Sequence, residues 1–181
     1  MEKYDGMRLT AVLAAWLKEQ EWKDEVEINE GRDFSRVATE IPIAEQDHRL
    51  YLECGEKEER FLVFFYSPLN VPASRIKDAA VLMNRINQRL PLGRVVTPDD
   101  GTPRPVQYKA VIDVEGSEFA SEQITNMVAS GISVFEDFGS VFGALAVTKQ
   151  SADQIWDEFL KAEKEAEEQA EKASSEAPSE L

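Results

Sequence analysis

The most regular pattern in the sequence is a row of apolar residues that recurs at alternating steps of four and three. The row consists of Ile124, Val128, Gly131, Phe135, Phe138, Phe142 and Leu145. A mean spacing of 3.5 residues places these side chains on one narrow face of a helix. The pattern therefore predicts a long helix, beginning near Ser117, that lies along a sheet or pairs with another helix.

Four segments with strand-like patterns precede this helix. They are EVEIN (25–29), FSRVATEI (34–41), HRLYLEC (48–54) and RFLVFFY (60–66). In the first three, mainly apolar side chains alternate with mainly polar ones, which is typical of strands with one buried face. The fourth is apolar on both faces, which predicts a central strand with cover on both sides. Short turns between these segments favour an antiparallel meander.

Two further helices and a hairpin complete the predicted domain. Leu9, Val12, Leu13, Trp16 and Leu17 have the spacing of a helix buried on one face. A second helix is expected from about Pro72 to Leu90, followed by a hairpin of GRVVT (93–97) and PVQYKAVIDVEG (105–116) around the turn PDDGTPRP (98–105). The predicted order is helix, four strands, helix, two strands, long helix. This is an α+β fold with an antiparallel sheet packed by helices.

Charge restricts the partners of the chain. It has 35 acidic and 20 basic residues and a net charge of −15, whereas nucleic-acid binding needs clustered Lys and Arg. The N-terminal MEKYDGMRLT lacks the features of a secretory signal, and no apolar run approaches membrane-spanning length. We expect a cytoplasmic protein that neither binds nucleic acid nor inserts into a membrane.

The C-terminal segment 151–176 reads as a helix that changes character midway. Ile155, Trp156, Phe159 and Leu160 can anchor its first turns, but no large apolar residue follows until the last residue of the chain. Its three interpretations, in order of preference, are a solvated helix, a docking segment for a basic partner and a coiled coil. The expected division is a domain at 1–148, a charged helix at 149–173 and a disordered tail at 174–181.

The sequence contains no recognisable catalytic or metal-binding constellation. His48 and Cys54 are the only residues of their kinds, too few for a zinc site of the usual ligands. We interpret His48 as a surface turn residue and Cys54 as a buried, inert thiol. Glycine-rich phosphate loops and the G-x-S-x-G nucleophile motif are also missing. The sequence therefore predicts no enzyme activity, no metal and no cofactor.

Two groups of residues are predicted to have a special role. Asn87 falls within the apolar stripe of its helix, and such an amide must find partners. Its expected partners are backbone groups of the following loop or of an adjacent strand, with ligand contact as the alternative. Phe135, Phe138 and Phe142 either face the core or contribute to a subunit interface, where Gly131 would permit close approach.

The middle and later parts of the chain resemble the YbjN-like family of bacterial sensory-transduction regulators. The resemblance is carried by FYSPLNVPASRIKDAAVLMNRINQRLPLGRV (65–95), VIDVEG (111–116) and SVFEDFGSVFGALA (133–146). Its motif residues here are Val71-Pro72, Asn87 and Leu90-Pro91-Leu92-Gly93. It spans about residues 5–148 and excludes the acidic tail. It implies a type III secretion chaperone-like fold, a tendency to dimerise and no established enzyme activity.

The sequence thus favours a non-enzymatic, protein-binding regulator or chaperone-like module that acts as a homodimer. The second hypothesis is a small-molecule-sensing domain, with Tyr66, Tyr108 and Asn87 lining a pocket between sheet and helices. A hydrolase that uses scattered carboxylates is the third and weakest hypothesis.

Overall fold

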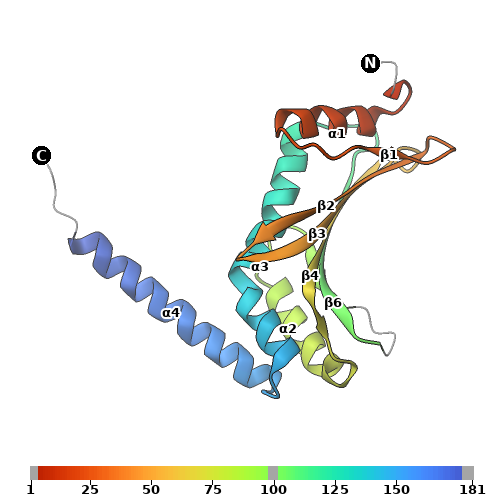
Figure 1. The fold of residues 1–181 in the computed structure, drawn as a ribbon. Helices are drawn as coiled ribbons and strands as arrows, with labels where there is room; N and C mark the ends of the chain where they lie inside the picture. The colour runs from red at the N-terminus through yellow and green to blue at the C-terminus, as the bar shows by residue number, and fades with distance from the viewer. Residues whose placement is uncertain (1–3, 98–101, 177–181) are drawn as a thin grey trace, which may run out of the picture.

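The computed structural model describes residues 4–97 and 102–176, and its helices and strands follow the predicted order (Figure 1). Six strands form one antiparallel sheet in the order β1-β2-β3-β4-β6-β5. The strands are β1 (Glu27–Ile28), β2 (Phe34–Ile43), β3 (Gln46–Gly55), β4 (Arg60–Val71), β5 (Arg94–Val96) and β6 (Arg104–Asp113). The α+β class and the antiparallel meander are confirmed. The predicted turn at 98–105 lies partly outside the described residues.

Helices cover one face of this sheet. The long helix α3 (Ser121–Val147) lies along it, with α1 (Arg8–Glu19) near one end and α2 (Ile76–Asn87) near the other (Figure 1). Phe61, Val63 and Phe65 of β4 point to this covered face and are fully buried. The intervening β4 residues point to the opposite face and are half-buried. β4 is central as predicted, but no helix in the described part of the chain covers its second face.

The close approach of α3 to the sheet depends on Gly131. A Cβ atom at this position would lie 2.3 Å from Cε2 of Phe65 and 3.1 Å from Cδ1 of Tyr108. Because glycine has no side chain, the helix axis can lie nearer to β4 and β6 here than any other residue would allow.

The phenylalanines of the predicted dimer seam are buried within a single chain. Phe135 contacts Phe142, with 5.5 Å between ring centroids, and Phe138 contacts Phe159 of α4 (Ala152–Glu176) at 5.3 Å. Phe135, Phe138 and Phe142 are at most 5% exposed. The seam is therefore filled by this chain's own residues and presents almost no area to a second subunit.

By length and composition alone, α3 could also cross a membrane, contrary to the expectation that no apolar run approaches membrane-spanning length. A core helix has the same composition, and most of the large apolar residues of α3 lie against the sheet and the neighbouring helices. Its burial in the fold accounts for its hydropathy.

Arginines of α2 hold the first half of α4 against the domain. The Arg89 guanidinium lies 5.4 Å from the ring centroid of Phe159 and pairs with Glu163 at 2.6 Å. Arg85 pairs with Asp153. The second half of α4 projects from the folded body (Figure 1). It ends at Glu176, so residues 174–176 of the predicted tail belong to the helix, and 177–181 lie outside the described residues.

The interpretation of His48 as a surface residue is wrong. Ala44 and Glu45, both with positive φ, form the turn between β2 and β3, so His48 is already inside β3 and points to the covered face. It is 4% exposed, its ring centroid lies 4.6 Å from that of Phe135, and Nδ1 donates to the Gln46 carbonyl at 2.9 Å. Burial lowers its pKa. Cys54 is fully buried as predicted, and burial raises its pKa to about 12.

Replacement of Gly131 by alanine should destabilise the fold by about 1–3 kcal/mol, because the new methyl group overlaps the ring of Phe65. Gly139→Ala in the same helix is the matched control, since its Cβ would meet nothing within 4 Å. There alanine should stabilise the helix by about 0.5–1 kcal/mol. Denaturant unfolding of both variants checks the prediction, and equal stabilities would contradict it.

Acid should destabilise the fold through His48. The unfolded chain takes up a proton near the ordinary pKa of 6.5, whereas the buried ring stays neutral to lower pH. The unfolded state then binds more protons, so the free energy of unfolding falls as the pH drops from 6.5 towards the folded pKa. His48→Gln lacks this component. The free energies of unfolding of the wild type and of His48→Gln, measured between about pH 7.5 and pH 5, should approach each other as the pH falls. A difference between the two proteins that does not change with pH would rule the effect out.

Candidate functional site

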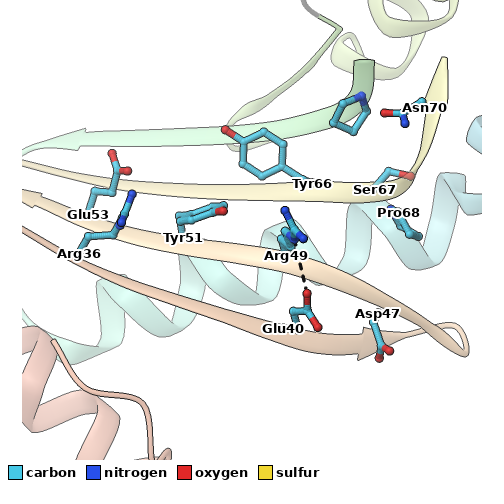
Figure 2. A pocket seen from close by; sticks show the side chains of 11 residues that line it. Arg36, Glu40, Asp47, Arg49, Tyr51, Glu53, Tyr66, Ser67, Pro68 and Asn70 are labelled. Carbon is cyan, nitrogen blue, oxygen red and sulfur yellow. Dashed lines mark hydrogen bonds and ion pairs between the residues drawn. The ribbon is translucent and has the colours of Figure 1, made fainter. Parts of the chain in front are cut away.

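The sheet face opposite α3, which we call the open face, is the most distinctive surface of the fold. Residues from β2, β3, β4 and β6 lie across it in three rows set by the strand register. The rows are Arg36–Glu53–Leu62–Val111, Ala38–Tyr51–Phe64–Lys109 and Glu40–Arg49–Tyr66–Gln107. In Figure 2 the labelled side chains of this face point towards the viewer, with α3 behind the strands. The face combines aromatic rings with charged groups of both signs.

The aromatic rings are held in place by polar neighbours. Tyr51 and Tyr66 meet edge to face, with 5.5 Å between centroids. Gln107 Nε2 donates to the Tyr66 hydroxyl at 2.7 Å, and burial raises the pKa of that hydroxyl. Lys109 Nζ lies 5.2 Å from the ring centroid of Phe64. The rings are thus ordered yet only half-buried, and they form an apolar platform open to solvent.

Charged groups surround this platform. Arg36 lies over Tyr51 at 5.6 Å and pairs with Glu27 at 3.0 Å. Arg49 pairs with Glu40 at 3.4 Å, and both side chains are more than 60% exposed. Burial raises the pKa of Glu53, while the positive charges of Arg36 and Lys109 act to lower it. Such exposed pairs contribute little stability and can exchange partners.

A hollow of about 740 Å³ lies over one part of the open face (Figure 2). Its floor includes Arg49, Tyr51 and Tyr66, and one wall is the end of β4. The register of β4 against β6 shifts between Tyr66 and Asn70, and the Leu69 N–H donates to Ser67 Oγ there at 3.1 Å. Such an irregularity bends a strand, and this one brings Ser67, Pro68 and Asn70 to the rim.

The three residues predicted to line a pocket do not come together. Tyr66 pairs in register with Gln107 and points to the open face, whereas Tyr108 pairs with Phe65 and points to the covered face. The Tyr108 hydroxyl lies 3.2 Å from the Leu92 carbonyl oxygen and 3.1 Å from Ser130 Oγ. Asn87 lies at the end of α2. The predicted pocket between sheet and helices is therefore not formed by these residues.

Asn87 binds the edge strand β5. Its Nδ2 donates to the Val95 carbonyl at 3.0 Å, and the Val95 N–H donates to its Oδ1 at 2.7 Å. The amide thereby makes the pair of hydrogen bonds that a residue of another strand would make. It closes this edge of the sheet against further strand pairing.

The described residues include no group of three or more His, Cys, Asp or Glu side chains that could hold a metal ion. The absence of catalytic, metal and cofactor sites stays a prediction. Sequence reasoning did not identify Arg36, Arg49, Phe64 and Lys109 as neighbours of Tyr66. The segment RFLVFFY (60–66) could have indicated this site, because its second apolar face requires neighbouring side chains to cover it.

Most of the domain is similar to known proteins. The model of the YbjN family, "Putative bacterial sensory transduction regulator", matches residues 10–144. Similar solved structures include the HopA1–SchA chaperone–effector complex (13% identity, 74% of this chain and 96% of that chain, TM-score 0.48). A second is YbjN from E. coli (14% identity, 72% of this chain and 90% of that chain, TM-score 0.47). A third is the ExsC–ExsE complex (15% identity, 71% of this chain and 90% of that chain, TM-score 0.44). No curated protein matches the sequence.

Asn87→Ala should lower the free energy of unfolding by about 1–3 kcal/mol, because it leaves the N–H and C=O of Val95 without their partners. Asn84→Ala, on the exposed side of the same helix, is the matched control and should have little effect. Denaturant unfolding of the two variants measures the difference. Equal losses would show that the amide of Asn87 has no special contribution.

Proposed function

The chain belongs to the YbjN family, and from that premise we propose that it is a non-enzymatic, protein-binding regulator whose open face receives a segment of its partner. The supporting observation is the second face of β4. Leu62, Phe64 and Tyr66 form the centre of a sheet face that no described helix covers. A central strand with apolar residues on both faces is normally covered on both, so a partner is the expected cover.

The composition of the open face suits protein binding. Protein interfaces have an apolar centre and a polar rim, and their strongest contributions come from Tyr, Trp and Arg. Here Tyr51, Phe64 and Tyr66 form the centre, with Arg36 and Arg49 beside them. Because these rings are already ordered by their neighbours, a partner would bury them at little further cost in conformational entropy.

The proposal includes action as a homodimer in the cytoplasm. Since Phe135, Phe138 and Phe142 are buried in each chain, two copies would meet through another surface. Family resemblance supports the dimer, and the acidic surface supports a soluble protein.

A second candidate function is small-molecule sensing, favoured by the hollow of about 740 Å³ beside Tyr66. Arg49 could pair with an anionic group of a ligand and Tyr51 could contact an apolar ring. This hollow lies on the open face, whereas the predicted pocket lay between sheet and helices.

Capture of partners by the tagged full-length chain in lysate of its native cells tests the proposal. Phe64→Ala/Tyr66→Ala should lose the retained partners, with affinity reduced by about tenfold or more, because central aromatic residues dominate interface energies. Val147→Ala/Leu160→Ala, which removes exposed apolar side chains elsewhere, should retain them. Equal retention by both double variants would contradict a role for the open face. Melting shifts with a metabolite panel that vanish in Phe64→Ala/Tyr66→Ala would instead favour the sensor.

A further inference from the structure

The far part of α4, residues 164–173, forms an exposed helical arm. It extends away from the folded body in Figure 1, and all its side chains are exposed. Lys164 pairs with Glu168 within the helix at 3.8 Å, a contact that stabilises a helix only slightly. Helices in proteins owe most of their stability to packing of one face. The arm has no such packing against the described part of its own chain.

One side of the arm is suited to close contact. Within the arm, Ala166, Ala170 and Ala173 recur at steps of four and three, which places them along one face of the helix. Glu167 and Glu171 each follow an alanine and therefore lie along one border of that face. A helix with this arrangement can approach an apolar platform closely while its carboxylates reach cations beside it.

The open face offers the complementary charges. Arg36, Arg49 and Lys109 lie on the open face, and Arg94 is in register with Lys109. The face also carries acidic residues, of which Glu27 and Glu40 pair with Arg36 and Arg49, so the carboxylates of an arm would replace them as partners. Glu27, which pairs with Arg36, is 68% exposed, so this ion pair can be exchanged for another.

The length of the arm matches the width of the open face. A ten-residue helix is about 15 Å long, and the distance from β2 to β6 across three inter-strand spacings is about 14 Å. An arm lying across the strands therefore spans this distance. Glu167 and Glu171 are four residues, or about 6 Å, apart along it, so the long side chains of Arg36 and Lys109 would extend towards them from either side. The arm cannot lie on the open face of its own chain, because α4 packs against α3 and α2 on the covered side and points away from the sheet (Figure 1).

We propose that the arm of one copy lies on the open face of a second copy, with its alanines on Phe64 and Tyr66 and with Glu167 and Glu171 paired to Arg36, Arg49 and Lys109. Each copy gives an arm and receives one, which makes a symmetric dimer. The inference rests on the proposed function, since it takes the open face as the binding surface. It names a second copy of this chain as an occupant of that surface.

Sedimentation of full-length variants tests the contact. Arg36→Glu/Arg49→Glu and Glu167→Lys/Glu171→Lys should each weaken the dimer by about tenfold or more, because like charges then face one another. The chain with all four substitutions should recover dimerisation. Lys23→Glu/Lys57→Glu alters exposed cations outside the open face by the same charge change as the arginine variant. It should leave the dimer unchanged.

Three results would overturn the arm contact: a monomeric wild type at about 100 µM, well above ordinary dimer affinities, a dimer that resists both charge reversals, or no recovery in the fourfold variant. The proposed function is tested by a separate experiment, the capture of partners by Phe64→Ala/Tyr66→Ala. A monomer that still captures partners through Phe64 and Tyr66 would overturn the arm contact alone. An arm-dependent dimer whose captured partners ignore that double variant would overturn the proposed function alone.

Paramagnetic relaxation provides a second measurement that does not depend on altering the open face. A spin label on Gln169→Cys in one copy should broaden the amide signals of Tyr51, Phe64 and Lys109 in an isotopically labelled second copy. The fully buried Cys54 should remain unlabelled. Broadening confined to other surfaces would place the arm elsewhere and overturn the proposal, as would the absence of any broadening.

Discussion

The contact between α3 and the centre of the sheet at Gly131 is the constraint on which the other packing depends. Phe65 and Tyr108 lie directly beneath this glycine, and a methyl group there would overlap the Phe65 ring. The same helix then positions α1, through a hydrogen bond from Trp16 Nε1 to Thr125 Oγ1 at 2.9 Å, and α4, through the rings around Phe138. Because all three contacts involve one helix, the helical layer lies on one side of the sheet, and no helix among residues 4–97 and 102–176 covers the opposite side of β4.

An uncovered sheet face must remain soluble without losing its capacity to bind. The cations of the open face meet both needs, since the long side chains of Lys109 and Arg36 lie over Phe64 and Tyr51. Such side chains shield apolar rings while their charged ends stay in water. They can move aside when a partner arrives, because their ion pairs are exposed and weak. The sheet is also protected at one edge, where Asn87 occupies the hydrogen-bonding groups of Val95, so that edge cannot recruit a strand while the face stays accessible.

The element order could be predicted because it depends on local periodicity, whereas the composition of the site depends on register. Tyr66 and Tyr108 belong to paired strands, and a shift of one residue would exchange their faces. No local pattern fixes that pairing across forty residues. His48 was misplaced because the turn at Ala44 and Glu45 lacks the Asn or Gly that usually marks positive φ. The partner of Asn87 lies only eight residues further on, within the segment that directly follows the helix, so chain order alone restricts where its amide can bond.

The arm also changes where the charge of the molecule lies. Residues 150–181 hold ten acidic and three basic side chains, a charge of −7, which leaves −8 of the total −15 on residues 1–149. Repulsion between exposed charges is largely screened beyond about 10 Å at 0.1 M salt. Because the second half of α4 projects from the body (Figure 1), part of this charge is kept away from the surface that another protein must approach. Two bodies of this chain therefore repel each other less than the total charge suggests, while each arm still carries carboxylates that favour contact with the cations of an open face.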